Sequence, residues 1–151
     1  MRSPAPAPAD DSLVSTIQHR VGFHETDAMG IVHHSNYLRF CEQARVQWLE
    51  EHDRPYTYYI EVGLHFAVTR VELDYHRSAK FDDRLQVSTW LEVVRGASLR
   101  MSYRISCADV VLVTGATEHA AVDDEGRVRR IPKERRESLR ERLAVAEGPG
   151  A

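Results

Sequence analysis

Residues 36–52 read NYLRFCEQARVQWLEEH, and their apolar side chains recur at the spacing of an α-helix. The main stripe consists of Tyr37, Cys41, Ala44 and Trp48, with Leu38, Arg45 and Leu49 beside it. No other segment of the chain carries so long a helical pattern. The stripe must be buried against another element, so this segment predicts a central helix.

The segments around this helix show mostly the period of two that is typical of half-buried strands. Strands are predicted at Ile17–Phe23, around Val71–Tyr75, over Leu85–Val93, over Leu99–Ile105 and over Val110–Val122. A short helix is predicted at Tyr56–Val62, which Gly63 ends, and a charged terminal helix is predicted to begin at Pro132 and end before Gly148. Consecutive strands joined by short turns, such as the one at 124–126, indicate an antiparallel sheet packed on one helix, which is an α+β domain.

The length of 151 residues fits a single domain, which we expect over 16–145, between a flexible leader at 1–15 and a flexible tail at 146–151. One helix cannot cover both faces and both edges of such a sheet. A homodimer or a homotetramer, built as a dimer of dimers, is therefore expected.

Composition excludes several classes of protein. Hydrophobic content of 42% and charged content of 28% are ordinary for globular proteins, no apolar run is long enough to span a membrane, and the Pro- and Ala-rich start does not resemble a secretory signal, so we expect a cytoplasmic protein. Cys41 and Cys107 have no metal-ligand spacing and are expected to be reduced and buried. The cations between Arg127 and Arg136 lack interleaved aromatic residues, so they predict a solvated face rather than a nucleic-acid site.

The polar loop before the long helix contains the residues with chemical potential. Glu25-Thr26-Asp27-Ala28-Met29-Gly30 leads through Ile31-Val32-His33-His34-Ser35 to the helix. A helix N-terminus attracts developing negative charge, which a carbonyl oxygen acquires when a nucleophile attacks its carbon. Judged from its local sequence alone, Asp27 could simply be a turn residue that accepts hydrogen bonds from neighbouring backbone N–H groups. Gly30 would let the backbone approach a ligand closely.

This loop closely resembles a motif of hotdog-fold acyl-CoA thioesterases, namely the YbgC-like branch of the 4-hydroxybenzoyl-CoA thioesterase family. The shared pattern is Glu25-Thr26-Asp27, Gly30-Ile31-Val32, His34, Asn36-Tyr37, Glu42 and Ala44-Arg45, followed by a second signature at 75–83 with Leu85 and Val87. The similarity extends from Ile17 to about Ile131. Ser78 and Lys80 depart from this family, which often has Pro and Arg there.

The resemblance implies a hotdog fold and a hydrolase that needs no metal and no organic cofactor. It implies that Asp27 is the catalytic carboxylate, as nucleophile or as general base, and that the His34 N–H polarises the carbonyl. The His34 side chain could position water or the leaving sulfur, or be a loop histidine bonded to backbone. His33 is expected to be a bystander.

The remaining candidate residues line or flank the expected substrate site. Gly30, Ile31, Val32, Asn36 and Tyr37 are candidates for the acyl pocket, although Tyr37 also belongs to the core stripe and Asn36 could cap the helix. Glu42 fits an ion pair with Arg45, three residues on, better than a catalytic role. Arg70, Arg77, Lys80 and Arg84 are candidates for the coenzyme A phosphates, with Arg77 and Lys80 favoured by the signature that they occupy.

Three other functions remain open. The same site could release an acyl or polyketide chain from an acyl carrier protein. A non-catalytic acyl-CoA binding module would have no need of a carboxylate aimed at the thioester carbon. A hotdog dehydratase is the least favoured, because such enzymes resemble a different arrangement of His and acid.

Overall fold

The computed structural model describes residues 7–144, and the remaining residues, including the predicted tail at 146–151, lie outside the described part. The elements in chain order are the 3-10 turn η1 (Asp11–Leu13), β1 (Ser15–Arg20), the 3-10 turn η2 (Phe23–Glu25), α1 (Asn36–His52), α2 (Tyr56–Val62), β2 (His65–Tyr75), β3 (Arg84–Val94), β4 (Ser98–Cys107), β5 (Val110–Val122) and α3 (Lys133–Arg140).

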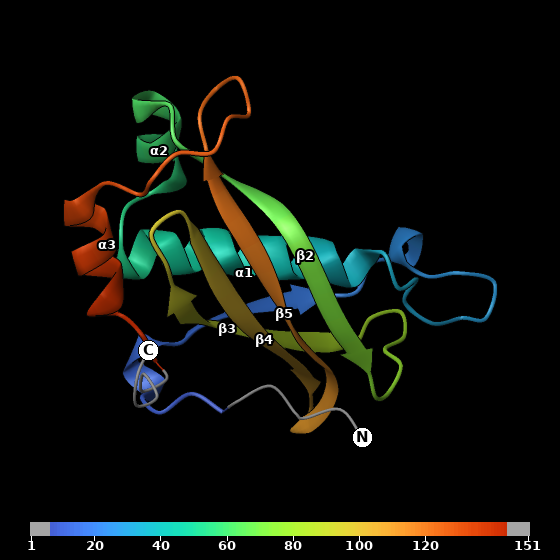
Figure 1. Cartoon of the computed structure of the whole chain (residues 1–151). Helices are drawn as coiled ribbons and strands as arrows, with labels where there is room; N and C mark the ends of the chain where they lie inside the picture. Colours follow the sequence, from blue (N-terminus) through green and yellow to red (C-terminus); the bar gives the residue numbers. More distant parts are fainter. Residues whose placement is uncertain (1–6, 145–151) are drawn as a thin grey trace.

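The five strands form one antiparallel sheet in the order β1-β3-β4-β5-β2. α1 lies across one face of this sheet (Figure 1), and its buried residues Phe40, Ala44 and Trp48 join the core with apolar residues of β3 and β4. This is the α+β arrangement of the hotdog fold, so the predicted fold class is confirmed. Within residues 7–144, no helix is long and apolar enough to cross a membrane.

The predicted bounds of α1, α2 and β5 agree with the structure. Gly63 ends α2 in the left-handed region at φ 70°, as a glycine cap should. The first strand was predicted to start two residues too late and to end three residues too late. β1 ends at Arg20 because the chain then turns into η2, where Glu25 Oε1 accepts a hydrogen bond from Gly22 N–H. Within the segment 1–15 predicted as a leader, the Leu13 carbonyl accepts a hydrogen bond from Trp48 Nε1 at 2.9 Å.

The basic segment 127–136 is not the uniform solvated face that the sequence predicted. The Arg135 side chain is only 9% exposed and donates to Asp53 Oδ1 at 2.9 Å, and the Asp53 side chain is 0% exposed. Tyr59 also donates a hydrogen bond to Asp53. This buried ion pair attaches α3 to the end of α1.

Cys107 is half-buried rather than buried, whereas Cys41 lies inside the core, and both are free thiols. Burial raises the pKa of Cys41 to about 12, although the nearby Arg45 opposes the shift. Cys41 is therefore a neutral packing residue and not a nucleophile.

Gly115 in β5 lies against the backbone of β2. A Cβ atom at this position would stand 2.0 Å from the Glu72 carbonyl oxygen, so the two strands would have to separate. We expect Gly115→Ala to lower the free energy of unfolding by about 1–3 kcal/mol, the usual cost of overpacking. Urea unfolding measures this, and Gly126→Ala serves as the comparison, because no atom lies within 4 Å of its Cβ position and only its positive φ opposes the change. An unchanged midpoint in Gly115→Ala would contradict the close approach.

Candidate active site

The loop between η2 and α1 is a tight turn centred on Asp27. The Asp27 backbone N–H donates to the Ile31 carbonyl at 2.9 Å, and the Met29 N–H donates to Asp27 Oδ1 at 2.8 Å. Gly30 adopts φ 78° and has no atom within 4 Å of its Cβ position. Asp27 is thus a turn residue, as its local sequence allows, and Gly30 is required by its backbone conformation rather than by a close approach to another part of the chain.

The loop is joined through its backbone to the segment after β2. Ile31 forms an antiparallel bridge with Lys80, and Val32 N–H donates to the Ala79 carbonyl at 2.9 Å. The two sequence signatures, separated by about fifty residues in the chain, are therefore neighbours in space. Residues near Arg77 can contact a ligand that also reaches Asp27.

A cavity of about 240 Å³ lies where these two segments meet. Six predicted site residues line it, namely Asp27, Ile31, Val32, His34, Tyr37 and Arg77, together with Met29, Tyr75, His76 and Ser78. Asp27 is half-buried and His34 is exposed, so the cavity is open to solvent on the His34 side. Tyr37, only 3% exposed, serves both the core and the cavity wall.

Three predicted site residues do not line this cavity. Asn36 is not among the lining residues, and its amide nitrogen donates to the carbonyls of Glu25 and His33 at 2.9 and 3.3 Å. A cap would accept from helix N–H groups, and the residue in the cap position is Ser35, so the alternative that Asn36 caps the helix was wrong. Lys80 has an exposed side chain and a backbone bridge to Ile31, and Gly30 supplies the positive φ of the turn.

The start of α1 leaves one backbone donor beside the cavity, because the N–H groups of Asn36 and Tyr37 donate to the His33 and His34 carbonyls at 3.0 and 3.4 Å, whereas His34 itself lines the cavity. Ser35 precedes the helix without a side-chain cap, and within residues 7–144 the His34 N–H has no hydrogen-bond acceptor. The His34 ring stacks on His33 at 4.3 Å between ring centroids, while His33 Nδ1 pairs with Ser35 Oγ at 2.8 Å. A free N–H beside a helix N-terminus is a suitable donor to an oxyanion.

Glu25 holds the start of the loop from inside the protein. Its Oε1 accepts hydrogen bonds from Gly22 N–H at 2.7 Å and from His19 Nε2 at 2.8 Å, and its carbonyl accepts from His33 N–H at 2.8 Å. Burial raises the pKa of Glu25, but the bonds from Gly22 and His19 outweigh burial and hold the pKa below its ordinary value of 4.5. Glu25 belongs to the sequence motif, but its spacing did not predict this anchoring role.

Glu25→Gln should weaken this anchor, because the amide loses the negative charge that strengthens both bonds. We expect a loss of about 1–3 kcal/mol of unfolding free energy at neutral pH. A carboxyl whose folded pKa is lowered stabilises above its unfolded pKa, and this contribution is lost as pH falls through the folded value. Chemical unfolding at neutral pH and below pH ~4 should therefore show the difference between wild type and variant shrinking in acid. Glu50→Gln, on the exposed side of α1, is the control, and a difference that does not change with pH would refute this role.

Of the four candidate phosphate ligands, only Arg77 lines the cavity. Its side chain is exposed and has no ion-pair partner among the described residues. Arg70 lies in the middle of β2 and pairs with Glu72, and Arg84 is exposed at the start of β3. Across residues 7–144, no group of three or more His, Cys, Asp or Glu side chains is arranged to hold a metal ion.

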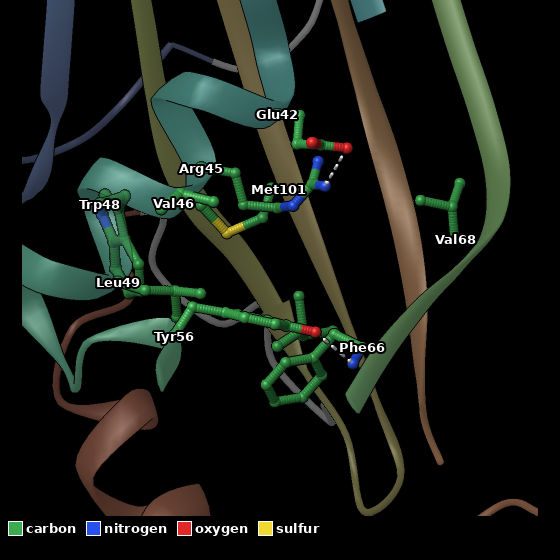
Figure 2. Close-up of a pocket in the computed structure, with 10 residues that line it drawn as sticks. Glu42, Arg45, Val46, Trp48, Leu49, Tyr56, Phe66, Val68 and Met101 are labelled. Atoms are coloured by element: carbon green, nitrogen blue, oxygen red, sulfur yellow. Dashed lines mark hydrogen bonds and ion pairs between the residues drawn. The ribbon is translucent and has the colours of Figure 1, made fainter. Parts of the chain in front are cut away.

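A second cavity, of about 310 Å³, was not predicted from the sequence. It lies between α1, α2 and strands β2 and β4 (Figure 2) and is lined by Glu42, Arg45, Val46, Trp48, Leu49, Tyr56, Phe66, Val68, Leu99 and Met101. The predicted pair of Glu42 with Arg45 is present, with 3.9 Å between Oε2 and a guanidinium nitrogen. The sequence pattern that could have indicated this cavity is the row beside the main apolar stripe of α1, since its residues Arg45 and Leu49 line the cavity.

The model of the Thioesterase-like superfamily matches residues 21–143, which include both cavities. The chain belongs to this superfamily. It is a YbgC-like hotdog thioesterase, as the loop motif indicated, and hence a thioester hydrolase.

Individual relatives of this thioesterase agree with the family match. A putative esterase of Aquifex aeolicus is 35% identical over 122 residues, covering 81% of this chain and 94% of the relative. The acyl-CoA thioesterase YbgC of Haemophilus influenzae is 35% identical over 118 residues, covering 76% of this chain and 86% of its own. The crystal structure of a probable thioesterase from Bartonella henselae superposes with a TM-score of 0.74 at 31% identity, covering 79% of this chain and 99% of that one.

Proposed function

We propose that the protein is an acyl-CoA thioesterase in which Asp27 is the catalytic carboxylate. One observation carries the proposal: Asp27 lines the same cavity as His34, the residue just before α1 whose backbone N–H has no acceptor among residues 7–144. A carboxylate facing an oxyanion donor is the arrangement that acyl transfer to water requires.

In the proposed reaction, the thioester carbonyl oxygen lies toward the His34 N–H and the α1 N-terminus. Asp27 either removes a proton from the attacking water or attacks the carbonyl carbon itself, giving an anhydride that water then cleaves. In both routes the C–S bond breaks, a C–O bond forms, and the coenzyme A thiolate takes up a proton. The His34 imidazole lines the cavity and is a candidate to position the water or the sulfur.

The cavity lining suggests how the two ends of the substrate are held. Ile31, Val32 and Tyr37 supply an apolar wall for the first atoms of the acyl group. Arg77, exposed at the edge of the same cavity, is placed to pair with a phosphate of coenzyme A, and Lys80 follows it on the surface. The reaction uses no metal and no organic cofactor in this proposal.

We infer a homodimer, or a dimer of dimers, from the edge strand β2. The edge is eleven residues long and exposes Val68 by 52%, Val71 by 41% and Tyr75 by 51%. Long apolar edges are normally covered by another strand. Antiparallel pairing of two β2 strands about their centre would set the Phe66 end of one beside the Tyr75 end of the other. The cavity beside α1 that is lined by Arg45 and Phe66, called the apolar cavity below, would then adjoin the Asp27 cavity of the partner protomer.

The proposal is tested by coenzyme A release from aliphatic and aromatic acyl-CoA thioesters, followed with a thiol reagent. We expect kcat/KM above about 10⁴ M⁻¹s⁻¹ for the preferred acyl group. Tight binding of intact thioesters without hydrolysis would instead favour the binding module. The same acyl group presented on coenzyme A and on an acyl carrier protein separates the two thioesterase functions. We expect coenzyme A to be preferred, because it offers more phosphate charge than a carrier arm for the exposed Arg77 to pair with. Size-exclusion chromatography with light scattering gives the molar mass of the protein in solution. The mass of a monomer would refute the inferred dimer.

The proposed location is the cytoplasm, where free thiols such as Cys41 and Cys107 stay reduced. Neither a nucleic acid nor a membrane is a partner in this proposal.

A further inference from the structure

The apolar cavity beside α1 contains one cation for which the proposed hydrolysis has no use. Arg45 extends from α1 beside Val46 and Met101 (Figure 2), in a cavity that Phe66 also lines, and its side chain is only 14% exposed. Placing a guanidinium in apolar surroundings costs free energy unless its N–H groups find acceptors. The partners of Arg45 therefore indicate what the cavity is suited to hold.

A buried chain of hydrogen bonds to side chains of β4 and β5 holds the Arg45 guanidinium in place. Its guanidinium donates to Tyr103 Oη at 3.1 Å, Tyr103 pairs with Thr117 Oγ1 at 2.6 Å, and Thr117 pairs with His119 Nε2 at 2.7 Å. Burial and the Arg45 charge lower the pKa of His119 to about 4, so the ring is neutral and can accept from Thr117. Each hydroxyl can then donate onward, which leaves the Tyr103 oxygen free to accept from Arg45.

The charge of Arg45 is incompletely neutralised. Its only carboxylate partner among residues 7–144 is Glu42, at 3.9 Å, and the Glu42 side chain is 70% exposed. Exposed pairs of this kind contribute little. A guanidinium has five N–H donors, and Tyr103 and Glu42 leave several of them available to a ligand in the cavity.

We propose that this cavity binds the far end of the acyl group, and that Arg45 selects acyl groups ending in a carboxylate. This inference rests on the proposed function, because it assigns a substrate class to the same thioesterase. The apolar walls accept the methylene chain, and the fixed guanidinium pairs with the terminal carboxylate. The preferred substrates are thus coenzyme A monothioesters of dicarboxylic acids.

The distance to the thioester sets a requirement on chain length. Tyr37, at the Asp27 cavity, and Arg45 are eight residues apart on α1, which is about 12 Å along a helix. The proposed β2 pairing would offer a second approach, from the Asp27 cavity of the partner. Along either route the acyl group must be of medium length, so suberyl-CoA and octanoyl-CoA form a matched pair of test substrates that differ only in the terminal group.

The test compares kcat/KM for these two thioesters in wild type, Arg45→Met and Arg45→Lys. A hydrogen-bonded charge pair is worth about 1.5–3 kcal/mol, so Arg45→Met should lower kcat/KM for suberyl-CoA by about 10- to 100-fold and leave octanoyl-CoA unchanged or improved. Arg45→Lys should keep part of the preference for suberyl-CoA. Arg39→Met, the same change at an exposed position of α1, should affect neither substrate.

Each outcome decides the inference. An equal loss for both substrates in Arg45→Met would show that Arg45 acts in structure or in contact with a second copy, and would overturn it. A wild-type protein that hydrolyses octanoyl-CoA faster than suberyl-CoA would also overturn it while leaving the proposed function intact. Absence of hydrolysis with every thioester would instead refute the proposed function.

Discussion

Asp27→Asn is expected to reduce kcat for thioester hydrolysis by about 10²- to 10⁴-fold, the usual contribution of a general base or more. The amide keeps an oxygen that can accept from Met29 N–H, so the turn should be preserved. The neutral amide can neither deprotonate water nor attack a carbonyl carbon. Stopped-flow and steady-state assays of coenzyme A release give the ratio directly.

Asp82→Asn is the matched control for this change. Asp82 carries an exposed carboxylate in the neighbouring segment, where it pairs with Arg20, and it does not line the Asp27 cavity. Its φ of 72° is one that Asn tolerates. Undiminished turnover in Asp27→Asn, or an equal loss in Asp82→Asn, would contradict a catalytic role for Asp27.

Isotope labelling distinguishes the two possible roles of Asp27. In a single turnover in H₂¹⁸O, an anhydride intermediate can place the label in the Asp27 carboxylate when water attacks on that side. General-base catalysis places all of the label in the released acid. Mass spectrometry of the peptide that contains Asp27 reads the result.

Arg135→Leu should cause the largest loss of stability of the changes considered, about 3–5 kcal/mol, because it leaves the Asp53 carboxylate buried without its cation. Burial and the adjacent Asp53 raise the pKa of Tyr59, so its hydroxyl stays protonated and remains the carboxylate's other side-chain partner. One neutral donor is a poor replacement for a guanidinium. Thermal and urea unfolding measure the loss.

The double variant Asp53→Asn with Arg135→Leu is the informative comparison. Removing the charge from Asp53 relieves much of the penalty, so the double variant should be more stable than Arg135→Leu alone. Lys133→Met, at an 81% exposed position of the same helix, should change stability by less than about 0.5 kcal/mol. Additive losses in the double variant would show that the two side chains do not act as a pair.

The sequence was most informative where the structure is determined locally. The bounds of α1 and α2 follow from a helical stripe and from Gly63, which act within one or two turns. The loop before α1 was predicted for the same reason, since a positive φ such as that of Gly30 is set by the residue itself. The family resemblance added the chemistry of Asp27, which its local sequence left as a turn residue.

What could not be predicted depends on contacts between distant segments. The donor role of Asn36 is visible only once the Glu25 and His33 carbonyls lie beside it. The burial of Arg135 depends on Asp53, eighty-two positions away. The cavity around Arg45 needs α1 to cross the sheet where Phe66 and Val68 of β2 face it, an arrangement that no periodicity encodes.

The bridge between Ile31 and Lys80 has a consequence for engineering and for divergence among homologues. Transplanting the loop 24–35 from a relative would import one half of a backbone ladder without the other. Segment 76–83 should therefore be exchanged together with it. Substitutions that alter specificity at the Asp27 cavity are then expected to accumulate in pairs, one in segment 24–35 and one in segment 76–83, rather than independently.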